Sequence, residues 1–319
     1  MSPAAKDDAP DPGIGRSRRE TVISRAAGAL EDELAKPLAP GLYLVSTPIG
    51  NLADLSLRAL ATLARVDLIC CEDTRHSRKL FSHFGIASQL HAYHEHNAAK
   101  ERPRILARIV AGQSVALISD AGTPLISDPG HKLARVVLEA GFPVIAIPGA
   151  SAPLAALTSS GLPTDRFFFE GFLPPKREAR RKRLEALCDI PATLLFFEAP
   201  SRLQAMLEDA RDILGNREGA LAKELTKLHE AVWRGSFEEL ALRAGDDAVL
   251  KGEFVVLAGP PPPVQVPDAD IQARLEVALR DASLRDGVQD VAAMLDVPRK
   301  RVYKIALGLK DIAARDDAT

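Results

Sequence analysis

The sequence predicts an α/β protein with two domains, the first built on a parallel sheet and the second on a mixed sheet, followed by a small helix-turn-helix module. Apolar strand-like runs alternate with helical patterns from 41 to 150, which is typical of a parallel sheet. From 151 to 260 long helices are fewer and adjacent strands can pair as hairpins, which favours a mixed sheet. A proline run at 259–263 then separates a helical module at 268–315.

Composition places the chain among ordinary globular proteins. Its 319 residues suffice for two domains with their own cores, and 46% are hydrophobic and 26% charged. The formal net charge is only -2, so any argument for nucleic-acid binding must rest on local patches. Three cysteines give neither a disulfide framework nor a metal-ligand spacing, which fits a reducing cytoplasm. No apolar run is long enough to predict a membrane span.

The N-terminal segment differs from the rest of the chain. Its residues mix Pro, Gly and Ala with charges of both signs, and helical periodicity is confined to about 18–36. Such a composition offers few apolar residues for a core, so we predict a flexible extension over residues 1–38.

The first domain, 41–150, is predicted from apolar strands that each end in a loop of small or charged residues. Parallel strands deliver such loops to one edge of a sheet, where ligands bind to exposed backbone N–H groups. Neither a GxGxxG nor a GxxxxGK[ST] motif is present, so the dinucleotide fingerprint and the P-loop are both excluded. The predicted strands are 42–46, 68–71, 115–118 and 143–147, and the predicted helices are 56–65, 75–84, 98–110 and 131–140.

The central ligand loop is 119–130, with the sequence Ser-Asp-Ala-Gly-Thr-Pro-Leu-Ile-Ser-Asp-Pro-Gly. Gly122 allows a ligand to approach the backbone, Pro124 stiffens the turn, and Asp120 supplies a carboxylate for a hydroxyl or an amine. Standing alone, this loop could be an ordinary strand-to-helix turn. Because similar loops follow other strands at 47–51 and 148–152, we predict one shared pocket.

Three histidines lie within 91–97, His-Ala-Tyr-His-Glu-His-Asn. Their spacing of i, i+3 and i+5 in a strand-to-loop segment matches the known spacings of metal ligands poorly. We therefore predict no metal site and interpret the segment as a polar loop that borders a substrate cleft.

The second domain, 151–260, contains a basic helix at 176–183, with six Lys or Arg in eight residues. It could be an ordinary solvated surface. Because the chain is otherwise nearly neutral, contact with phosphates is the second hypothesis. The residues of that hypothesis are Lys176, Arg177, Arg180 and Arg181. Strands at 165–170 and 193–197 and helices ending at 160 and 214 complete the predicted domain.

The C-terminal module predicts a helix over 288–295, a turn over 296–298 and a basic second helix over 299–307, which is a helix-turn-helix pattern. It could equally be a plain packing module. The candidate phosphate contacts of the second helix are Arg299, Lys300, Arg301 and Lys304, of which the last three share one helix face by their spacing.

Six short motifs form a specific set. They are Thr-Pro-Ile-Gly-Asn at 47–51, Glu-Asp-Thr-Arg at 72–75, Ser-Asp-Ala-Gly-Thr-Pro with Ser-Asp-Pro-Gly at 119–130, Pro-Gly-Ala-Ser-Ala at 148–152, Phe-Phe-Glu-Ala-Pro-Ser-Arg-Leu at 196–203 and Lys-Glu-Leu-Thr-Lys at 223–227. Together they resemble the family of small-subunit ribosomal RNA 2'-O-methyltransferases within the tetrapyrrole methylase superfamily. The resemblance covers 41–260 continuously and extends into the C-terminal module, and the N-terminal extension lies outside it.

The resemblance implies a tetrapyrrole-methylase-like fold, S-adenosylmethionine as the methyl donor and a homodimer. The implied acceptor is the ribose 2'-hydroxyl of a cytidine in the decoding region of 16S rRNA, within small ribosomal subunit particles. The predicted cofactor-binding residues lie in the edge loops and at the end of strand 193–197. They are Pro48, Gly50, Asp120, Ala121, Gly122, Pro124, Ser151, Ala152, Phe197 and Glu198.

Transfer to a ribose hydroxyl requires that oxygen, methyl carbon and sulfur lie in line and that a group takes the hydroxyl proton. A carboxylate or a lysine of lowered pKa could take it. The catalytic candidates lie at a strand end of the first domain and in the second domain, and each could instead belong to a structural ion pair. They are Glu72, Asp73, Arg75, Lys223 and Glu224.

Two other functions stay open. A tetrapyrrole C-methyltransferase on the same fold would have no evident use for the basic helix and the C-terminal module. A non-catalytic helix-turn-helix DNA-binding regulator would bind duplex DNA tightly and transfer no methyl group.

Overall fold

The computed structural model describes residues 15–245, 251–262 and 266–316. The chain divides into two compact units, Met1–Pro261 and Pro262–Thr319, each described by itself. Both α/β sheets lie in the first unit and three helices in the second.

The predicted flexible extension contains a helix, α1 (Arg16–Ala35). No side chain of α1 is buried, but the helix contacts α2 (Leu57–Arg65), and Arg65 Nη1 donates to Glu33 O over 2.8 Å. Its many strong helix formers and this docking explain the order that composition alone did not predict. Residues 1–14 of the predicted extension lie outside the described part of the chain.

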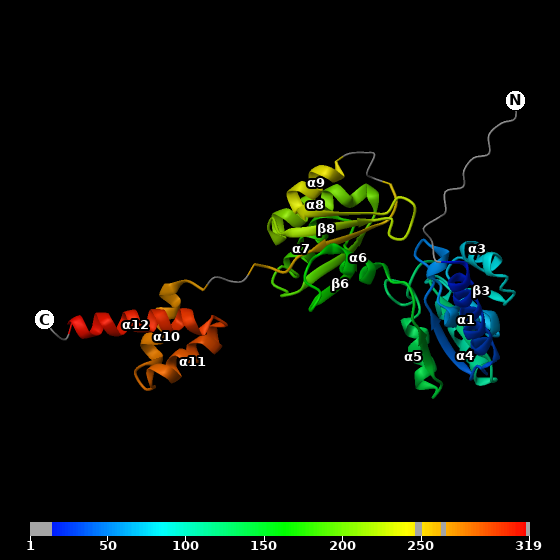
Figure 1. The fold of residues 1–319 in the computed structure, drawn as a ribbon, viewed down its shortest axis with the longest axis horizontal. Helices are drawn as coiled ribbons and strands as arrows, with labels where there is room; N and C mark the ends of the chain where they lie inside the picture. Colours follow the sequence, from blue (N-terminus) through cyan, green and yellow to red (C-terminus); the bar gives the residue numbers. More distant parts are fainter. Residues whose placement is uncertain (1–14, 246–250, 263–265, 317–319) are drawn as a thin grey trace, which may run out of the picture. The chain divides into compact units, whose positions relative to one another are not determined.

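The first sheet, which belongs to the blue-to-green part of the chain in Figure 1, is parallel throughout and has the strand order β3-β2-β4-β1-β5. Four of its strands are those that the sequence predicted, and β3 adds an edge strand from the histidine segment. Because all five run the same way, their carboxyl ends meet at one edge of the sheet. The strands are β1 (Gly41–Val45), β2 (Leu68–Cys71), β3 (Leu90–Ala92), β4 (Ser114–Ile118) and β5 (Val144–Ile147).

Helices cover both faces of this sheet, which is why its strands are continuous apolar runs. On β2, Ile69 and Cys71 pack toward α2 and α3 (Thr74–Phe84), whereas Leu68 and Cys70 pack toward α4 (Ala98–Val110) and α5 (His131–Glu139). A short 3-10 helix, Leu52–Asp54, precedes α2.

The second sheet has the order β6-β7-β10-β8-β9, with β6 parallel to β7 and the other pairs antiparallel. This confirms the predicted mixed sheet. One face is covered by α7, α8 and α9, and the other by α6 together with Ile49 from the first sheet's edge. The elements are α6 (Ala152–Ser160), β6 (Phe167–Phe172), α7 (Arg177–Glu185), β7 (Thr193–Glu198), α8 (Pro200–Leu214), β8 (Glu218–Lys223), β9 (Ala231–Ser236), α9 (Phe237–Ala244) and β10 (Phe254–Ala258).

The second unit consists of α10 (Asp268–Ala278), α11 (Leu284–Leu295) and α12 (Arg299–Asp316) around a small apolar core. The predicted helix-turn-helix corresponds to α11 and α12, and Asp296 between them has a left-handed φ of 50°. The helix α10 was not predicted. No helix among the described residues is both long and apolar enough to cross a membrane.

Candidate functional site

The loop after β4 holds a conformation that ordinary residues rarely adopt. Leu125 and Ser127 have positive φ values of 71° and 61°, and such strain persists where the surroundings fix it. The Ser119 hydroxyl donates to the Asp128 carboxylate across the base of the loop. Backbone hydrogen bonds of 3.0 and 3.1 Å between Thr47 and Gly122 tie this loop to the loop after β1. Two predicted ligand loops are therefore fixed side by side.

A cleft of about 420 Å³ opens at this edge, between the loops of the first sheet and the strand ends of the second. Its walls from the second sheet are largely apolar and include Phe172 and Phe254. Phe172 and Phe169 both pack against Phe197, with ring centroids 5.4 and 5.0 Å away. Seven of the predicted cofactor residues line the cleft: Asp120, Ala121, Gly122, Ser151, Ala152, Phe197 and Glu198.

The other three predicted cofactor residues, Pro48, Gly50 and Pro124, do not line the cleft. Gly50 instead allows close contact with the loop after β8. A Cβ at Gly50 would lie 2.8 Å from Thr226 Oγ1 and closer still to Lys227 Cγ. The neighbouring Asn51 N donates to the same Thr226 hydroxyl over 3.1 Å. We conclude that Gly50 joins the two halves of the site.

Glu198, at the end of β7, is a buried carboxylate on the wall of the cleft. Its Oε1 accepts from Ala199 N over 2.7 Å and from Arg202 Nη2 over 2.6 Å. Its Oε2 is buried and has no hydrogen-bond partner among the described residues. A buried charged oxygen without a donor is costly, so this position suits a ligand that carries an amine or a hydroxyl.

A second cavity, of about 650 Å³, adjoins the first and shares Ser127 and Asp128 with it. Glu72, at the end of β2, lines this second cavity. Glu72 is exposed to solvent, but partial desolvation of its carboxyl raises the pKa, and the nearby charges of Asp120 and Asp128 raise it further. Burial likewise raises the pKa of Asp128. Among the catalytic candidates, Glu72 is therefore the carboxylate best able to hold a proton.

Asp73 and Arg75 have local structural roles. Asp73 Oδ1 accepts from Arg75 N over 2.7 Å and so caps α3, and Asp73 N donates to Asp120 Oδ1 over 3.2 Å. The predicted Glu-Asp-Thr-Arg strand end thus lies against the central ligand loop, but Asp73 and Arg75 line neither cavity.

Glu224 and Lys223 also lie outside both cavities. Lys227 Nζ bonds Glu224 Oε1 over 2.8 Å and Glu253 Oε2 over 3.0 Å. Burial would raise the pKa of Glu224, but its hydrogen bonds with Lys227 and the Glu253 amide outweigh burial and lower it. Lys223 Nζ lies 5.9 Å from the centre of the Trp233 ring. The structure therefore favours the ion-pair alternative for Glu224.

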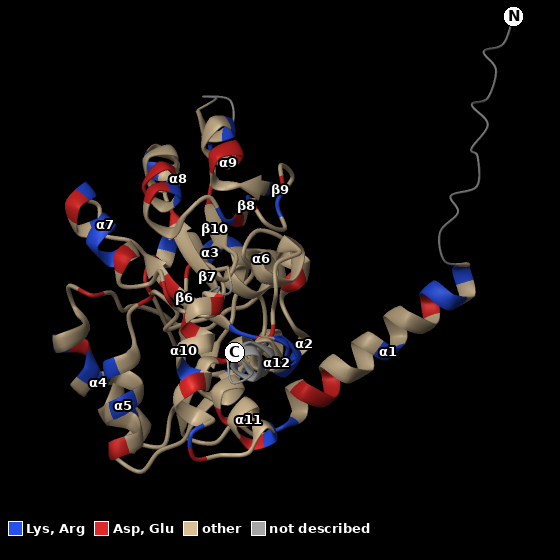
Figure 2. Ribbon diagram, turned by 90° about the vertical axis from the view of Figure 1, so that its left-hand side faces the viewer, with Lys and Arg blue, Asp and Glu red and all other residues tan. Residues whose placement is uncertain are grey.

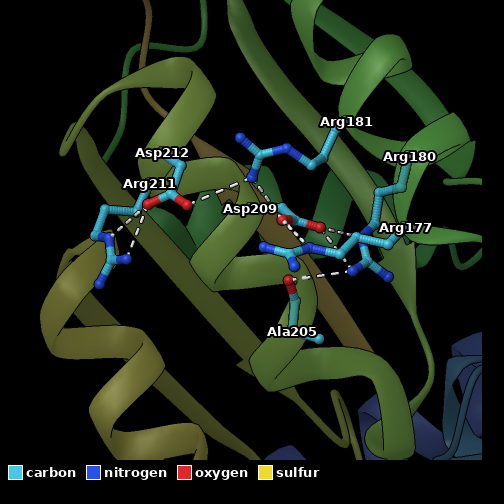
Figure 3. A network of polar contacts seen from close by, with 7 residues as sticks. All are labelled: Arg177, Arg180, Arg181, Ala205, Asp209, Arg211 and Asp212. Carbon is cyan, nitrogen blue, oxygen red and sulfur yellow. Dashed lines mark hydrogen bonds and ion pairs between the residues drawn. The ribbon is translucent and has the colours of Figure 1, made fainter.

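The helix α7 carries a run of basic residues (Figure 2), and its arginines bind acidic residues of α8 (Figure 3). The carboxylate of Asp209 on α8 forms ion pairs with three arginines, whose nearest guanidinium nitrogens lie 3.3 Å (Arg177), 2.6 Å (Arg180) and 2.8 Å (Arg181) from its oxygens. The side chain of Arg180 is only 6% exposed. We therefore assign Arg180 to this ion-pair network, whereas Lys176 and Arg177 lie at the surface.

The histidine segment is held by its own hydrogen bonds. His91 Nε2 lies 2.8 Å from Glu101 Oε2, and Asn97 Nδ2 donates to Ala92 O over 2.9 Å. Within residues 15–245, 251–262 and 266–316, no three His, Cys, Asp or Glu side chains gather as metal ligands.

In the C-terminal unit, Arg301 binds α10 and the residue Val266 that precedes this helix. Its guanidinium donates to the Asp268 carboxylate with Nε at 3.0 Å and to Val266 O with Nη2 at 2.7 Å. Arg299, Lys300 and Lys304 are exposed on α12.

Sequence reasoning placed Phe197 and Glu198 at the cleft but missed the rest of its second-sheet wall. It did not predict a separate second cavity, although the histidine segment that was expected to border a substrate cleft contributes Tyr93 and Glu95 to it.

Asp128 lies in the central ligand loop, 119–130, but is not among the predicted site residues. A carboxylate two residues before Gly130 was a signal in the sequence that could have indicated it. Residues 252–255, which also line the cleft, carry no motif that could have been recognised.

Comparisons with known proteins agree with these observations. Residues 41–241 match the model of the family described as Tetrapyrrole (Corrin/Porphyrin) Methylases. A protein of Mesorhizobium japonicum named ribosomal RNA small subunit methyltransferase I is 48% identical over 284 residues, which cover 89% of this chain and 97% of that protein. A protein of the same name from Pseudomonas aeruginosa is 45% identical over 271 residues, covering 83% and 96%.

Solved structures share the fold at low sequence identity. A uroporphyrin-III-C-methyltransferase from Thermus thermophilus has a TM-score of 0.51 and 22% identity, covering 69% of this chain and 94% of that one. A cobalt precorrin-4 methyltransferase has a TM-score of 0.53 and 14% identity, covering 72% and 95%. At such identities the likeness concerns the fold alone.

Proposed function

The chain belongs to the tetrapyrrole methylase family, in its ribosomal RNA small subunit methyltransferase I branch, and from this we propose a specific reaction for it. The protein transfers a methyl group from S-adenosylmethionine to the ribose 2'-hydroxyl of a cytidine in the decoding region of 16S rRNA. Its substrate is the small ribosomal subunit particle in the cytoplasm, and it acts as a homodimer.

The observation that carries the proposal is the cleft with its unsatisfied carboxylate. Adenosine and methionine both carry amino groups, and the ribose carries hydroxyls, so the cofactor offers donors that fit Glu198 Oε2. Small residues at 121, 122 and 152 leave room at the loop side, and the phenylalanines of the second sheet supply an apolar wall. The residues present therefore fit S-adenosylmethionine.

When bound, S-adenosylmethionine supplies an electrophilic methyl group. The role of the chain is to orient the acceptor, exclude water and take one proton. Phe172 and Phe197 exclude water from the cleft wall. Glu72, which has a raised pKa, takes the proton of the 2'-hydroxyl. Asp120, whose carboxylate accepts from Asp73 N, fixes the two strand ends against one another.

The proposed RNA contacts lie outside the cleft. They are Lys176, Arg177 and Arg181 on and before α7, and Arg299, Lys300 and Lys304 on α12. Arg180 and Arg301 are assigned to internal contacts instead, because the side chain of Arg180 is only 6% exposed against Asp209 and Arg301 binds both Asp268 and Val266 O. Arg177 and Arg181 also pair with Asp209, but their side chains are 73% and 33% exposed. Surface cations of this kind add affinity for phosphates without reading sequence.

The test is methyl transfer in solution from radiolabelled S-adenosylmethionine. We expect turnover on small-subunit particles from a strain that lacks this gene and none on free cytidine, because one nucleoside cannot reach cations outside the cleft. Equal turnover on both would contradict the particle as substrate. Transfer to uroporphyrinogen III, or tight duplex DNA binding without transfer, would favour the alternatives named above.

A further inference from the structure

The second cavity differs in chemistry from the cofactor cleft. It lies on the first sheet's side of the site and is lined by charged residues from several elements. Arg102 on α4 and Lys132 on α5 supply cations, and Glu72, Glu95 and Asp128 supply carboxylates. A cavity of about 650 Å³ is within the size range of small-molecule sites.

Arg102 has a donor without an acceptor. Its Nε is buried and makes no hydrogen bond to any described residue. Two basic neighbours of Arg102 do have a partner, since Glu101 binds both Arg104, over 2.9 Å, and His91, over 2.8 Å. A buried donor without an acceptor costs stability, so Arg102 is suited to an acceptor that arrives with a ligand.

Tyr93 forms part of the same wall and is almost fully buried, at 1% exposure. Burial raises the pKa of its phenol, and the adjacent Arg102 partly offsets this rise. The Arg102 guanidinium therefore lies against a buried neighbour, the Tyr93 phenol. A guanidinium held in this way can meet a phosphate with little loss of conformational entropy.

We propose that the second cavity receives the acceptor nucleotide, turned out of its RNA strand, with Arg102 and Lys132 binding its phosphate. Enzymes that modify a nucleotide commonly extrude it into a pocket, and single-stranded RNA offers such nucleotides at low cost. The inference rests on the proposed function and assigns a subsite to it. The cavities share Ser127 and Asp128, so a nucleotide in one adjoins a methyl donor in the other. Glu72 lies on the acceptor side.

The test compares two variants with two matched controls. Arg102→Gln is paired with Arg104→Gln, two residues along the same helix, and Lys132→Gln with Arg135→Gln on α5. Arg104 and Arg135 form ion pairs with Glu101 and Glu139 and line neither cavity. Single-turnover methylation is measured over a range of small-subunit particle concentrations at saturating S-adenosylmethionine, and calorimetry measures S-adenosylmethionine binding without RNA.

We expect each cavity variant to raise the half-saturating particle concentration by about tenfold or more, as expected for loss of a charge-assisted contact. Cofactor affinity and both controls should stay within about twofold of wild type, a difference well below 1 kcal/mol.

Particle titrations of Arg102→Gln and Lys132→Gln that match their controls would overturn the inference. A tenfold loss of cofactor affinity in either variant would overturn it too, because the cavity would then belong to the cofactor. If Arg102→Gln does not fold, the Lys132→Gln variant, which changes an exposed residue, tests the inference by itself. Failure of the proposed function is distinct, since wild-type protein would then place no 2'-O-methyl group on the particles.

Discussion

Glu72 is the residue on which the proposed chemistry depends most. It is a carboxylate at a strand end, it lines the second cavity, and partial desolvation together with Asp120 and Asp128 raises its pKa. Desolvation and neighbouring charge of one sign are the usual means by which a carboxyl becomes a general base near neutral pH.

Glu72→Gln should lower the rate constant for methyl transfer by about 100-fold to 10,000-fold without weakening cofactor binding. The unprotonated carboxylate is the active form, so wild-type activity should fall as pH drops through its raised pKa. This acid limb should lie above the ordinary Glu range, and the variant should lack it. A pH–rate profile measures both, with Glu139→Gln on the exposed end of α5 as the control. A wild-type rate that is constant down to pH 4 would argue against Glu72 as the base.

Gly122 tests the cofactor cleft. Its φ of 84° suits glycine, and a Cβ there would lie 3.1 Å from Ile49 Cγ2. Gly122→Val should therefore fill the loop side of the cleft and weaken S-adenosylmethionine binding, measured by calorimetry. Gly141→Val is the matched control, because its φ is 81° and nothing lies within 4 Å of its Cβ. Both should lose about 1–2 kcal/mol of stability through backbone strain. Unchanged cofactor affinity in folded Gly122→Val would show that the cleft is wrongly assigned.

Among the elements, α7 shows that one arginine of a basic run can have a structural role. Six cations in eight residues suggested an RNA surface, but Arg180 lies four residues before the buried Leu184 and so shares its inward face. The spacing of four residues between Arg180 and Leu184 was therefore the signal in the sequence that Arg180 faces inward. Asp209, at 2% side-chain exposure, then collects three guanidinium groups between α7 and α8 (Figure 3). The helix is held to its domain by this network.

Asp209→Asn should leave Arg180 buried with reduced compensation and lower the free energy of unfolding by about 3 kcal/mol in urea titration. This loss of stability should lie near the lower end of the range for removing one partner of a buried ion pair, because Arg177 and Arg181 reach solvent. Burial opposes ionisation of Asp209, but the arginines outweigh it and lower its pKa. Its contribution is therefore present above the ordinary Asp range and is lost as pH falls through the lowered pKa. Asp212→Asn, at a more exposed site, should cost less than about 1 kcal/mol. Equal losses in the two variants would contradict the network.

Four strands of the first sheet, and β6 and β7 of the second, could be predicted because their apolar runs are bounded by turn residues. The loop side of the cleft could be predicted for the same reason, since Asp120, Gly122 and Ser151 follow such strands. Of the opposite wall, Phe197 and Glu198 were predicted, but Gly252, Phe254 and their neighbours were not, because they reach the cleft only through the pairing of β10 with β7 and β8. Pairing between distant strands leaves no local signal in one sequence.

At the scale of the whole molecule, the C-terminal unit is proposed to position RNA and the first unit to perform the reaction. The linker sequence Gly259-Pro260-Pro261-Pro262 is stiff by composition. Positions 300, 301 and 304 share one face of α12, and because Arg301 is bonded to Asp268, Lys300 and Lys304 are the cations of that face that test this division of roles.

Lys300→Gln combined with Lys304→Gln should weaken particle binding and reduce the slope of log affinity against log salt by about 1 for each lysine. Cofactor affinity should not change, because the cleft belongs to the other unit. The control neutralises Arg274 on α10 and Arg280 in the turn after it, which removes the same charge from the same unit. If both double variants change the salt slope equally, the face of α12 has no special role.

The most direct measurement is a map of ribose and base methyl groups along 16S rRNA from a strain that lacks the gene. We predict that one cytidine in the decoding region loses its ribose methyl group, and that the wild-type gene restores it whereas the Glu72→Gln gene does not. A map identical to that of the parent strain, or a missing methyl group on a base rather than on a ribose, would contradict the proposed function.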